Sequence, residues 1–374
     1  MANSHQALIK NIGENINSEF DDYVPVILPD ESCMYFTSKL AGGINANRNG
    51  DNNYFEDIYV SKKINGSWQK AENMGFPINS EDNDACVAID HDGTRMIVYR
   101  STPDGAGGHL YLSRFGQHQH WEALTKLNVE INSNYIETSA CFSEDSASIY
   151  FSSNRPGGFG GKDIYRIKKL PNGKWGKALN LGSNINTKYD EDAPFLHPNG
   201  STLYFSSKGH NTMGEYDVFK SLYDIENQQF TKAENLGYPI NDVGNDIFFV
   251  LNADGTTGYY SSIKLVNFGG EDIYVVDMRY NENDLVVKKG FIFLDNQPGR
   301  ALVTLKNENT GELVGEYYSN SITGKFIIAV NPLNKYKLTI KAEGFEKIKS
   351  HYNPIESETN AEVLKFNLNK KHEP

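Results

Sequence analysis

Short runs of apolar residues, separated by turns rich in glycine and asparagine, make up most of the first 280 residues of the chain. Within these runs the apolar residues either alternate with polar ones or follow one another directly, which is typical of β-strands. No stretch carries a sustained apolar stripe at helical spacing. The pattern therefore predicts an all-β protein. Between residues 140 and 178 it predicts four strands, at Ala140–Ser143, Ser148–Ser153, Asp163–Lys168 and Trp175–Ala178.

The same group of strands recurs along the chain at a nearly constant interval. An Ile-Asn pair starts at positions 16, 78, 131, 185 and 240, with spacings of 62, 53, 54 and 55 residues. An Asp-Ile-Tyr triplet or a close variant starts at positions 57, 109, 163, 217 and 272, with spacings of 52, 54, 54 and 55. Because two unrelated markers keep one interval, we expect five copies of a four-stranded repeat.

The two ends of this region complement each other. Residues 9–22 match the end of a repeat, whereas the last repeat, from Asp246 to about Met278, lacks that portion. A closed ring completed by both chain ends would have this arrangement, and closure removes open sheet edges. The sequence thus predicts a five-bladed β-propeller over residues 6–280, closed by an N-terminal strand.

A second domain is expected over residues 285–370. The polar segment Asn281–Asp284 interrupts the rhythm, and about seven short alternating runs follow, with turn signals such as Asn309-Thr310-Gly311 between them. This pattern favours a small β-sandwich.

Composition and charge exclude several classes of protein. The net charge of −12 argues against nucleic-acid binding through a basic face. No apolar run is long enough to span a membrane as a helix, and the first residues lack the apolar core of a signal peptide. Three cysteines give neither a disulfide framework nor a metal-ligand spacing, and we expect Cys86 and Cys141 to be buried thiols. No cofactor is predicted.

An acidic residue stands six positions after each repeated Ile, just before the first strand of each repeat. In a propeller this position lies at one mouth of the central channel. A ring of carboxylates there could bind a cation or a basic segment of a partner; alternatively, each carboxylate bonds backbone N–H groups of its own loop. Repetition in every copy favours the structural alternative. The five residues are Asp22, Asp84, Glu137, Glu191 and Asp246.

The first repeat differs from the others by a loop that is longer by nine residues (21 positions between Phe36 and Asp57, against 12 between Phe151 and Asp163). Its spacing partly matches a calcium-binding EF-hand loop, but Asn replaces the usual first Asp and no flanking helices are predicted. An irregular recognition loop that contacts a partner, or simply a solvated loop, is favoured over a calcium site. The candidate residues are Asn45, Asn47, Asn49 and Asp51.

A recurring aromatic residue, at Trp68, Trp121, Trp175 and Phe230, is expected to pack between blades. The Ser-Ser pairs that start at 152, 206 and 261 are interpreted as strand ends rather than nucleophiles. The sequence contains no Gly-x-Ser-x-Gly elbow and no metal-ligating His pair at useful spacing. We therefore expect no enzyme but a protein-interaction module. A lectin that binds glycan through the exposed loop 43–55, and a glycan- or peptide-cleaving enzyme, remain as alternatives.

Several motifs resemble a known family. Tyr-Phe-Ser-Ser at 150–153 and 204–207, Gly-Gly-Lys-Asp-Ile-Tyr at 160–165, and Asn-Leu-Gly followed by Ile-Asn at 180–186 and 235–241 resemble the WD-repeat-like PD40 propellers of Bacteroidota OmpA-family proteins. Residues 301–305, 310–312 and 323–326, with Tyr336 and Gly344-Phe345, resemble the carboxypeptidase-regulatory-like domain of transthyretin type.

This order of domains is similar to the middle of the PorE-type component of the type IX secretion system, in which helical repeats precede the propeller and an OmpA-like domain follows the sandwich. Neither flank is present in this chain, so an excised fragment is expected. The resemblance implies a periplasmic scaffold associated with the outer membrane. Its implied partners are envelope or secretion-system proteins or peptides, and peptidoglycan through a domain outside this chain.

Overall fold

The computed structural model of the chain describes residues 8–45, 54–103, 107–116, 120–264, 267–278, 286–319, 324–330, 334–354 and 363–371. The chain divides into two compact units, Met1–Tyr280 and Asn281–Pro374. The described residues contain strands, bridges and turns but no helix, so the all-β prediction is confirmed.

The first unit consists of five antiparallel sheets, which we number in chain order by their innermost strands. Sheet 1 contains β2 (Asp22–Ile27), β3 (Cys33–Ser38), β4 (Asp57–Ile64), β5 (Ser67–Trp68) and β6 (Glu72–Asn73). Sheet 2 contains β7 (Asp84–Ile89), β8 (Arg95–Ser101), β9 (Gly108–Arg114) and β10 (Thr125–Lys126). Sheet 3 contains β11 (Ala140–Phe142), β12 (Ser148–Ser153), β13 (Asp163–Lys168) and β14 (Leu179–Asn180).

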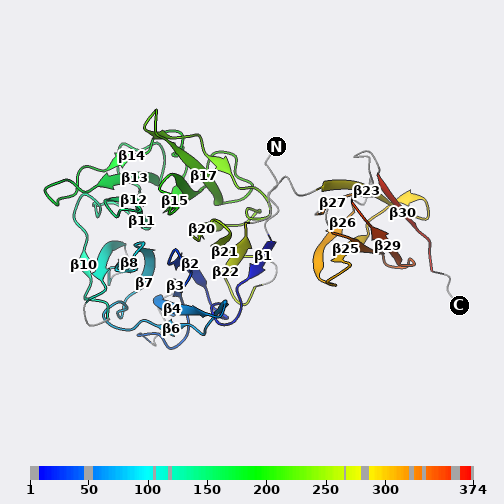
Figure 1. Cartoon of the computed structure of the whole chain (residues 1–374), viewed down its shortest axis with the longest axis horizontal. Helices are drawn as coiled ribbons and strands as arrows, with labels where there is room; N and C mark the ends of the chain where they lie inside the picture. Colours follow the sequence, from blue (N-terminus) through cyan, green and yellow to red (C-terminus); the bar gives the residue numbers. More distant parts are fainter. Residues whose placement is uncertain are drawn as a thin grey trace. The chain divides into compact units, whose positions relative to one another are not determined.

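Sheet 4 contains β15 (Glu191–Leu196), β16 (Thr202–Ser207), β17 (Asp217–Asp224), β18 (Gln229–Phe230) and β19 (Glu234–Asn235). Sheet 5 contains β20 (Asp246–Leu251), β21 (Thr257–Ser262), β22 (Asp272–Asp277) and, as its outermost strand, β1 (Leu8–Asn11). The five sheets surround a common centre, with β2, β7, β11, β15 and β20 innermost (Figure 1). Each inner strand contacts the next one, and β20 contacts β2. This is the architecture of a β-propeller.

The N-terminal strand occupies the place in sheet 5 that the last repeat leaves open. Strand β1 pairs antiparallel with β22 from Leu8 opposite Asp277 to Asn11 opposite Tyr274. The side chain of Asn11 donates a hydrogen bond of 2.6 Å to Asp272, and Ile12 N–H donates one to the carbonyl of Ile273. The pairing joins residues more than 250 positions apart in the chain.

One hydrogen-bond motif explains why the Ile-Asn and Asp-Ile-Tyr markers recur together. The side chain of the Asn bonds both backbone groups of the residue that follows the Asp. In sheet 3, Asn186 accepts a 2.8 Å hydrogen bond from the N–H of Ile164 and donates a 3.0 Å hydrogen bond to its carbonyl. Asn79, Asn132 and Asn241 hold Ile58, Leu110 and Val218 in the same way, and Asn17 holds Ile273 of sheet 5. A buried backbone N–H and a buried carbonyl are thereby satisfied by one side chain, because the Asn amide carries both an acceptor oxygen and a donor nitrogen.

The predicted fourth strand of sheet 3 is wrong in position. Trp175–Ala178 is not a strand: Trp175 forms one bridge to Lys169, and the strand is Leu179–Asn180. In sheets 1 and 4 the outer position is likewise divided into two short pieces that pair with the same neighbour. The hydrogen bond from Asn180 to Asp163 (2.7 Å) anchors the second piece, so a local polar contact places this strand rather than its apolar residues.

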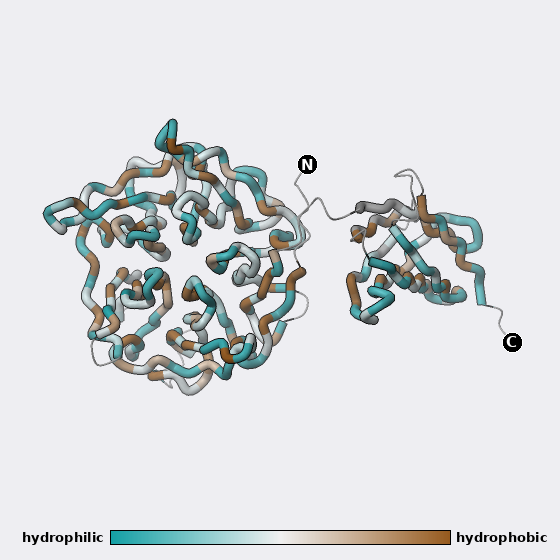
Figure 2. Tube along the Cα trace, viewed as in Figure 1, coloured by the Kyte–Doolittle hydropathy of each residue, from teal (hydrophilic) through white to brown (hydrophobic). Residues whose placement is uncertain are grey.

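Large aromatic side chains pack between neighbouring sheets, as expected from their recurrence. Trp68 lies 5.9 Å from Tyr259 of sheet 5, measured between ring centroids, and Trp121 lies 6.3 Å from Tyr35 of sheet 1. Phe230 similarly contacts Tyr150 of sheet 3 at 6.2 Å. All three pairs have the edge-to-face geometry that aromatic rings prefer. Figure 2 shows hydrophobic and hydrophilic positions interspersed along the five sheets.

The second unit is a β-sandwich of two four-stranded sheets. One sheet contains β24 (Gln297–Pro298), β23 (Val286–Leu294), β27 (Lys325–Val330) and β30 (Leu364–Leu368), the last parallel to β23. The other has the order β26 (Leu313–Tyr318), β25 (Leu302–Asn307), β28 (Tyr336–Lys341) and β29 (Ile348–Tyr352). Buried residues of both sheets, among them Ile292, Val303, Ile328 and Leu338, form one core. The strands that the sequence pattern located in this unit lie at 289–294, 301–306, 313–318, 325–330, 336–342 and 363–368, so strand β29 was not among them.

Candidate functional site

Each of the five repeated acidic residues closes the loop that precedes its inner strand. A residue four positions earlier donates its backbone N–H to the carboxylate: Ser18 to Asp22 at 2.5 Å, and Thr187 to Glu191 at 2.6 Å. The hydroxyl of the same Ser or Thr donates a second bond, of 2.7 Å in both loops. Ser80, Ser133 and, through its N–H alone, Asp242 serve Asp84, Glu137 and Asp246 equivalently. The carboxylates therefore fix the turns between sheets.

The second strand of the sheet supplies further donors. Ser153, Ser207 and Ser262 donate to Glu137, Glu191 and Asp246 at 2.6, 2.7 and 2.8 Å, so these serines are structural, as interpreted from the sequence. Three of the five carboxylates also face a cation: Asp84 pairs with Arg100, Glu137 with Arg155, and Asp246 with Lys264. For Asp22 and Glu191 the described residues provide no such ion pair.

Burial raises the pKa of several of these carboxyl groups, those of Asp22, Asp84, Glu191 and Asp246. It raises the pKa of Asp22 to about 6 and that of Glu191 to about 7. It also raises the pKa of Asp246 to about 6, although the nearby Lys264 acts in the opposite direction. In each case the cost of placing a charge in a low-dielectric interior exceeds the stabilisation by hydrogen bonds.

The raised pKa of Glu191 predicts a pH dependence of stability. Because the folded state binds the proton more tightly than the unfolded state (pKa about 7 against 4.5), this contribution is complete below pH 4.5 and is lost as the pH rises through 7. Glu191→Gln keeps the shape and cannot ionise, so its melting temperature should fall less between pH 5.5 and 8.5 than that of the wild type. The difference corresponds to about 3 kcal/mol at most.

Thermal melts at a series of pH values measure this effect, with the exposed Glu144→Gln as the matched control. Parallel pH profiles for the wild type and Glu191→Gln would contradict the assignment.

The five carboxylates are not available for direct contact with a partner, because none is more than 1% exposed. Their arrangement is what the backbone-bonding interpretation expects. Of the loop candidates, Asn45 donates a 2.9 Å hydrogen bond to the carbonyl of Glu81. Asn47, Asn49 and Asp51 lie outside the described residues, so the recognition loop stays a prediction. Among the described residues no group of His, Cys, Asp or Glu side chains is arranged to hold a metal ion.

The position just before the Asp of each third strand is exceptional, because it varies while its neighbours repeat. It is occupied by Glu56, Lys162, Tyr216 and Glu271 in sheets 1, 3, 4 and 5. Each backbone carbonyl accepts the N–H of a repeated acid of the next sheet, at 2.7 or 2.8 Å. These four side chains therefore stand at the same end of the channel. The repeat pattern did not predict these four residues, and the signal that could have found them is variation inside a repeat.

The variable positions create two different charge clusters. Lys39 lies 2.9 Å from Asp21 and 3.8 Å from Glu56, and burial together with the Asp21 carboxylate raises the pKa of Glu271 to about 7. Oε1 of Glu271 is buried and has no hydrogen-bond partner among the described residues.

On the other side of the channel Lys162 forms an ion pair with Asp192, which also accepts a bond from Ser139. Although burial acts to raise it, the Lys162 ammonium holds the pKa of Asp192 below its usual value.

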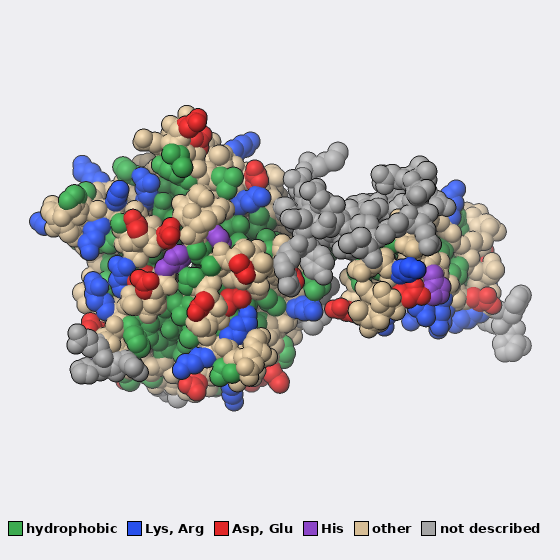
Figure 3. Space-filling model, viewed as in Figure 1, with side chains coloured by type: hydrophobic (Ala, Val, Ile, Leu, Met, Phe, Trp, Pro, Cys, Tyr) green, Lys and Arg blue, Asp and Glu red, His purple; other side chains and the backbone are tan. Residues whose placement is uncertain are grey.

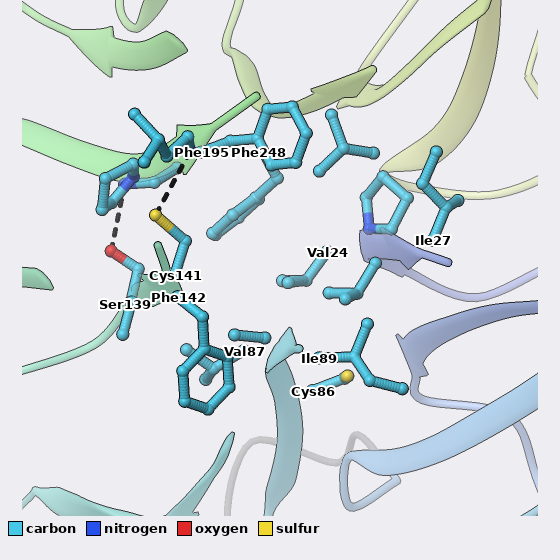
Figure 4. Close-up of a pocket in the computed structure, with 18 of the residues that line it drawn as sticks. Val24, Ile27, Cys86, Val87, Ile89, Ser139, Cys141, Phe142, Phe195 and Phe248 are labelled. Atoms are coloured by element: carbon cyan, nitrogen blue, oxygen red, sulfur yellow. Dashed lines mark hydrogen bonds between the residues drawn. The ribbon is translucent and has the colours of Figure 1, made fainter. Parts of the chain in front are cut away.

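A cavity of about 80 Å³ lies in the channel, and its walls come from all five inner strands. Its labelled side chains surround an open space in Figure 4 and are mainly apolar, among them Val24, Phe195 and Phe248. Cys86 and Cys141 line it as buried free thiols, so the prediction for these two cysteines is confirmed. The space is large enough for several water molecules.

Several exposed apolar side chains lie on the loops at the channel end that carries the variable positions. We call this surface the loop face. The loops before the inner strands and those between second and third strands lie together there: Gly161 N–H bonds to Tyr189 O, and Glu215 N–H to Gly244 O. Its large apolar side chains are between 47% and 86% exposed, and they are Tyr135, Ile136, Phe159, Tyr189, Val243, Ile263 and Phe268.

No protein-family model matches the sequence, and no curated protein matches it. Solved structures with a similar fold include TolB from Acinetobacter baumannii, at 16% identity over 70% of this chain and 56% of that chain, with a TM-score of 0.43. A TolB from Agrobacterium tumefaciens matches at 13% identity, over 86% of this chain and 96% of that chain, with a TM-score of 0.41.

An α-L-arabinofuranosidase from Lactobacillus brevis matches at 14% identity, over 71% of this chain and 92% of that chain, with a TM-score of 0.44. At these identities the likeness concerns the fold alone. The described residues contain no helix that is long and apolar enough to cross a membrane.

Proposed function

We propose that the chain is a non-catalytic interaction module of the bacterial envelope, with a five-bladed propeller that is closed by β1 and binds a protein partner through its loop face. The second unit would be a carboxypeptidase-regulatory-like domain. The motifs at 150–165 and 180–186 support a PD40-type propeller and, with the domain order, a periplasmic scaffold in an outer-membrane assembly of OmpA-family or PorE-type proteins.

The observation that carries the proposal is the group of exposed aromatic and aliphatic side chains on the loop face. Soluble proteins rarely expose apolar side chains together unless the surface binds something, and aromatic residues are enriched where proteins meet. Phe159 and Tyr189 lie on two adjoining loops, since the backbone of Gly161 bonds to that of Tyr189. Neither ring has a role in the core that would explain its presence.

The polar residues of the repeats have structural work instead. The repeated acids and the Asn of the Ile-Asn pair bond the backbone, and Ser153, Ser207 and Ser262 of the Ser-Ser pairs donate to the repeated acids. A catalytic group must keep an atom free to touch substrate, and these groups are committed to fixed bonds within each sheet. The repeated polar residues therefore stabilise the propeller, and the variable loops are left to bind a partner.

The double variant Phe159→Ala, Tyr189→Ala tests the proposal. If both rings contact the partner at the centre of the interface, capture of that partner from solubilised envelopes should weaken by a factor of ~30 or more. Ile225→Ala is the matched control, because Ile225 is 80% exposed but lies on the turn between β17 and β18, at the opposite end of sheet 4. Equal capture of the same partner by the wild type, the control and the double variant would refute the loop face as the binding surface.

A second candidate function is glycan cleavage, favoured by one observation: the Glu271 carboxyl, with a pKa of about 7, lies near the Asp21 carboxylate. Glycosidases pair a protonated carboxylic acid with a carboxylate in this way. Against it, Glu271 does not belong to the residues that line the channel cavity. Hydrolysis of a glycan that is abolished by Glu271→Gln, in a variant with wild-type stability, would establish this alternative.

A further inference from the structure

The outer surface of one sheet in the second unit is strongly basic. In the sheet β26-β25-β28-β29, Val303 and Leu305 of β25 and Leu338 and Ile340 of β28 point into the core and are fully buried. Because side chains alternate along a strand, the residues between them point outward. The exposed outward residues of the three strands β25, β28 and β29 include Lys306, Lys337, Lys341 and Lys349, which we call the basic face.

The strand register brings these lysines together. Lys306 stands directly opposite Lys337, and Lys337 stands directly opposite His351. Lys349 is opposite Thr339 and is therefore diagonal to both Lys337 and Lys341. Side chains directly opposite each other in an antiparallel pair are neighbours, and diagonal positions are within reach of long side chains. Figure 3 shows Lys and Arg side chains gathered along the lower side of this unit.

Few acidic groups balance this charge. Glu308 pairs with His351 at 2.7 Å, and Glu316 accepts a 3.3 Å bond from Thr304. None of the four lysines forms an ion pair with any residue that the structure describes. Like charges directly opposite each other destabilise a sheet, so the Lys306–Lys337 pair brings no structural benefit. An external anion would turn the repulsion into attraction.

We propose that the basic face binds the anionic headgroups of a lipid surface. The face presents flexible ammonium groups together with the hydroxyls of Thr304 and Thr339, which suits a layer of phosphates. A protein partner is less suited, because lysine is depleted and aromatic residues and arginine are enriched at protein interfaces. Recognition of nucleic acid on a sheet uses several stacked aromatic rings, whereas the outward positions of β25, β28 and β29 carry one histidine, His351, and no Phe, Tyr or Trp.

The experiment is co-sedimentation of the full chain with vesicles of phosphatidylglycerol and phosphatidylcholine in equal parts, compared with pure phosphatidylcholine. We expect binding to the anionic vesicles alone and its loss at high salt, since screening weakens surface charge. Lys306→Gln with Lys337→Gln should weaken binding about fivefold for each lysine removed, which corresponds to ~1 kcal/mol per lysine. The matched control is Lys365→Gln with Lys370→Gln, which removes the same charge from and just beyond β30 of the other sheet.

Thermal melts verify that the variants fold, and Lys341→Gln with Lys349→Gln provides a second pair on the basic face. The proposal is overturned if anionic vesicles do not bind, if neutral vesicles bind equally, or if the control pair weakens binding as much as the basic-face pairs. It is also overturned if inorganic phosphate displaces the chain at an ionic strength where sodium chloride does not, which would indicate a site for free phosphate, or if duplex DNA binds with the same lysine dependence.

Discussion

Deletion of residues 1–11 is expected to lower the melting temperature of the first unit by about 10 °C. The deletion removes β1, whose ladder with β22 spans Leu8 to Asn11, and with it the hydrogen bond from Asn11 to Asp272. Ile9 also packs against the buried cluster that contains Tyr260 and Val276. Each hydrogen bond of β1 contributes about 1 kcal/mol, and the burial of the Ile9 side chain contributes a similar amount. The free energy of unfolding should therefore fall by ~4 kcal/mol.

For a unit of this size each kcal/mol shifts the melting temperature by roughly 2–4 °C, which gives the expected decrease. The deletion also leaves β22 as an unpaired edge, so we expect concentration-dependent association of the shortened chain. Differential scanning calorimetry and light scattering measure the two effects, with a deletion of residues 1–7 as the matched control because it retains β1. Identical melting curves for the two deletions would refute the closure of the ring by β1.

Asn186→Ala is expected to reduce the free energy of unfolding by about 3 kcal/mol. Asn186 is 1% exposed and bonds both the N–H and the carbonyl of Ile164, and it donates to Asn180 at 2.8 Å. Alanine would leave these buried groups without partners, and each unsatisfied group carries its own desolvation penalty. The value is large because one side chain serves two backbone groups that water cannot reach.

Urea unfolding followed by fluorescence gives the free energy, and Asn227→Ala is the control, since Asn227 is exposed and bonds only the nearby Asp224. A loss no larger for Asn186→Ala than for Asn227→Ala would mean that the motif does not hold the repeat together.

Much of the first unit could be predicted because its repeat depends on local chemistry. The Asn that hydrogen-bonds to the third strand must follow that strand at a nearly fixed distance along the chain. Asn79 and Asn186 therefore recur with their partners Ile58 and Ile164. The same logic correctly placed the N-terminal residues with the last repeat. Prediction failed where apolar pattern is weak: strand β29 alternates with Lys349 and His351, and the outer strand of sheet 3 depends on one polar bond.

The candidate site was also predictable only in part. Periodicity alone identified Asp22, Glu191 and the other repeated acids, but their burial and their bonds to Ser18 and Thr187 follow from the packing of neighbouring loops. Sequence analysis could not find the loop face, since exposed Tyr189 and buried Tyr204 look alike in the chain.

The all-β class and the five-fold repeat were predictable from the sequence, because the period, the turn residues and the hydrogen bonds of the recurring Asn act over short distances along the chain. Tertiary structure alone decided which residues meet across strands and sheets. Lys306 and Lys337 stand opposite each other because of the register between β25 and β28. These two strands are separated along the chain by β26 of the same sheet and β27 of the other sheet. The difference between a buried carboxylate and an exposed ring depends on how the loops of two sheets pack, because burial is a property of the neighbours and not of the residue.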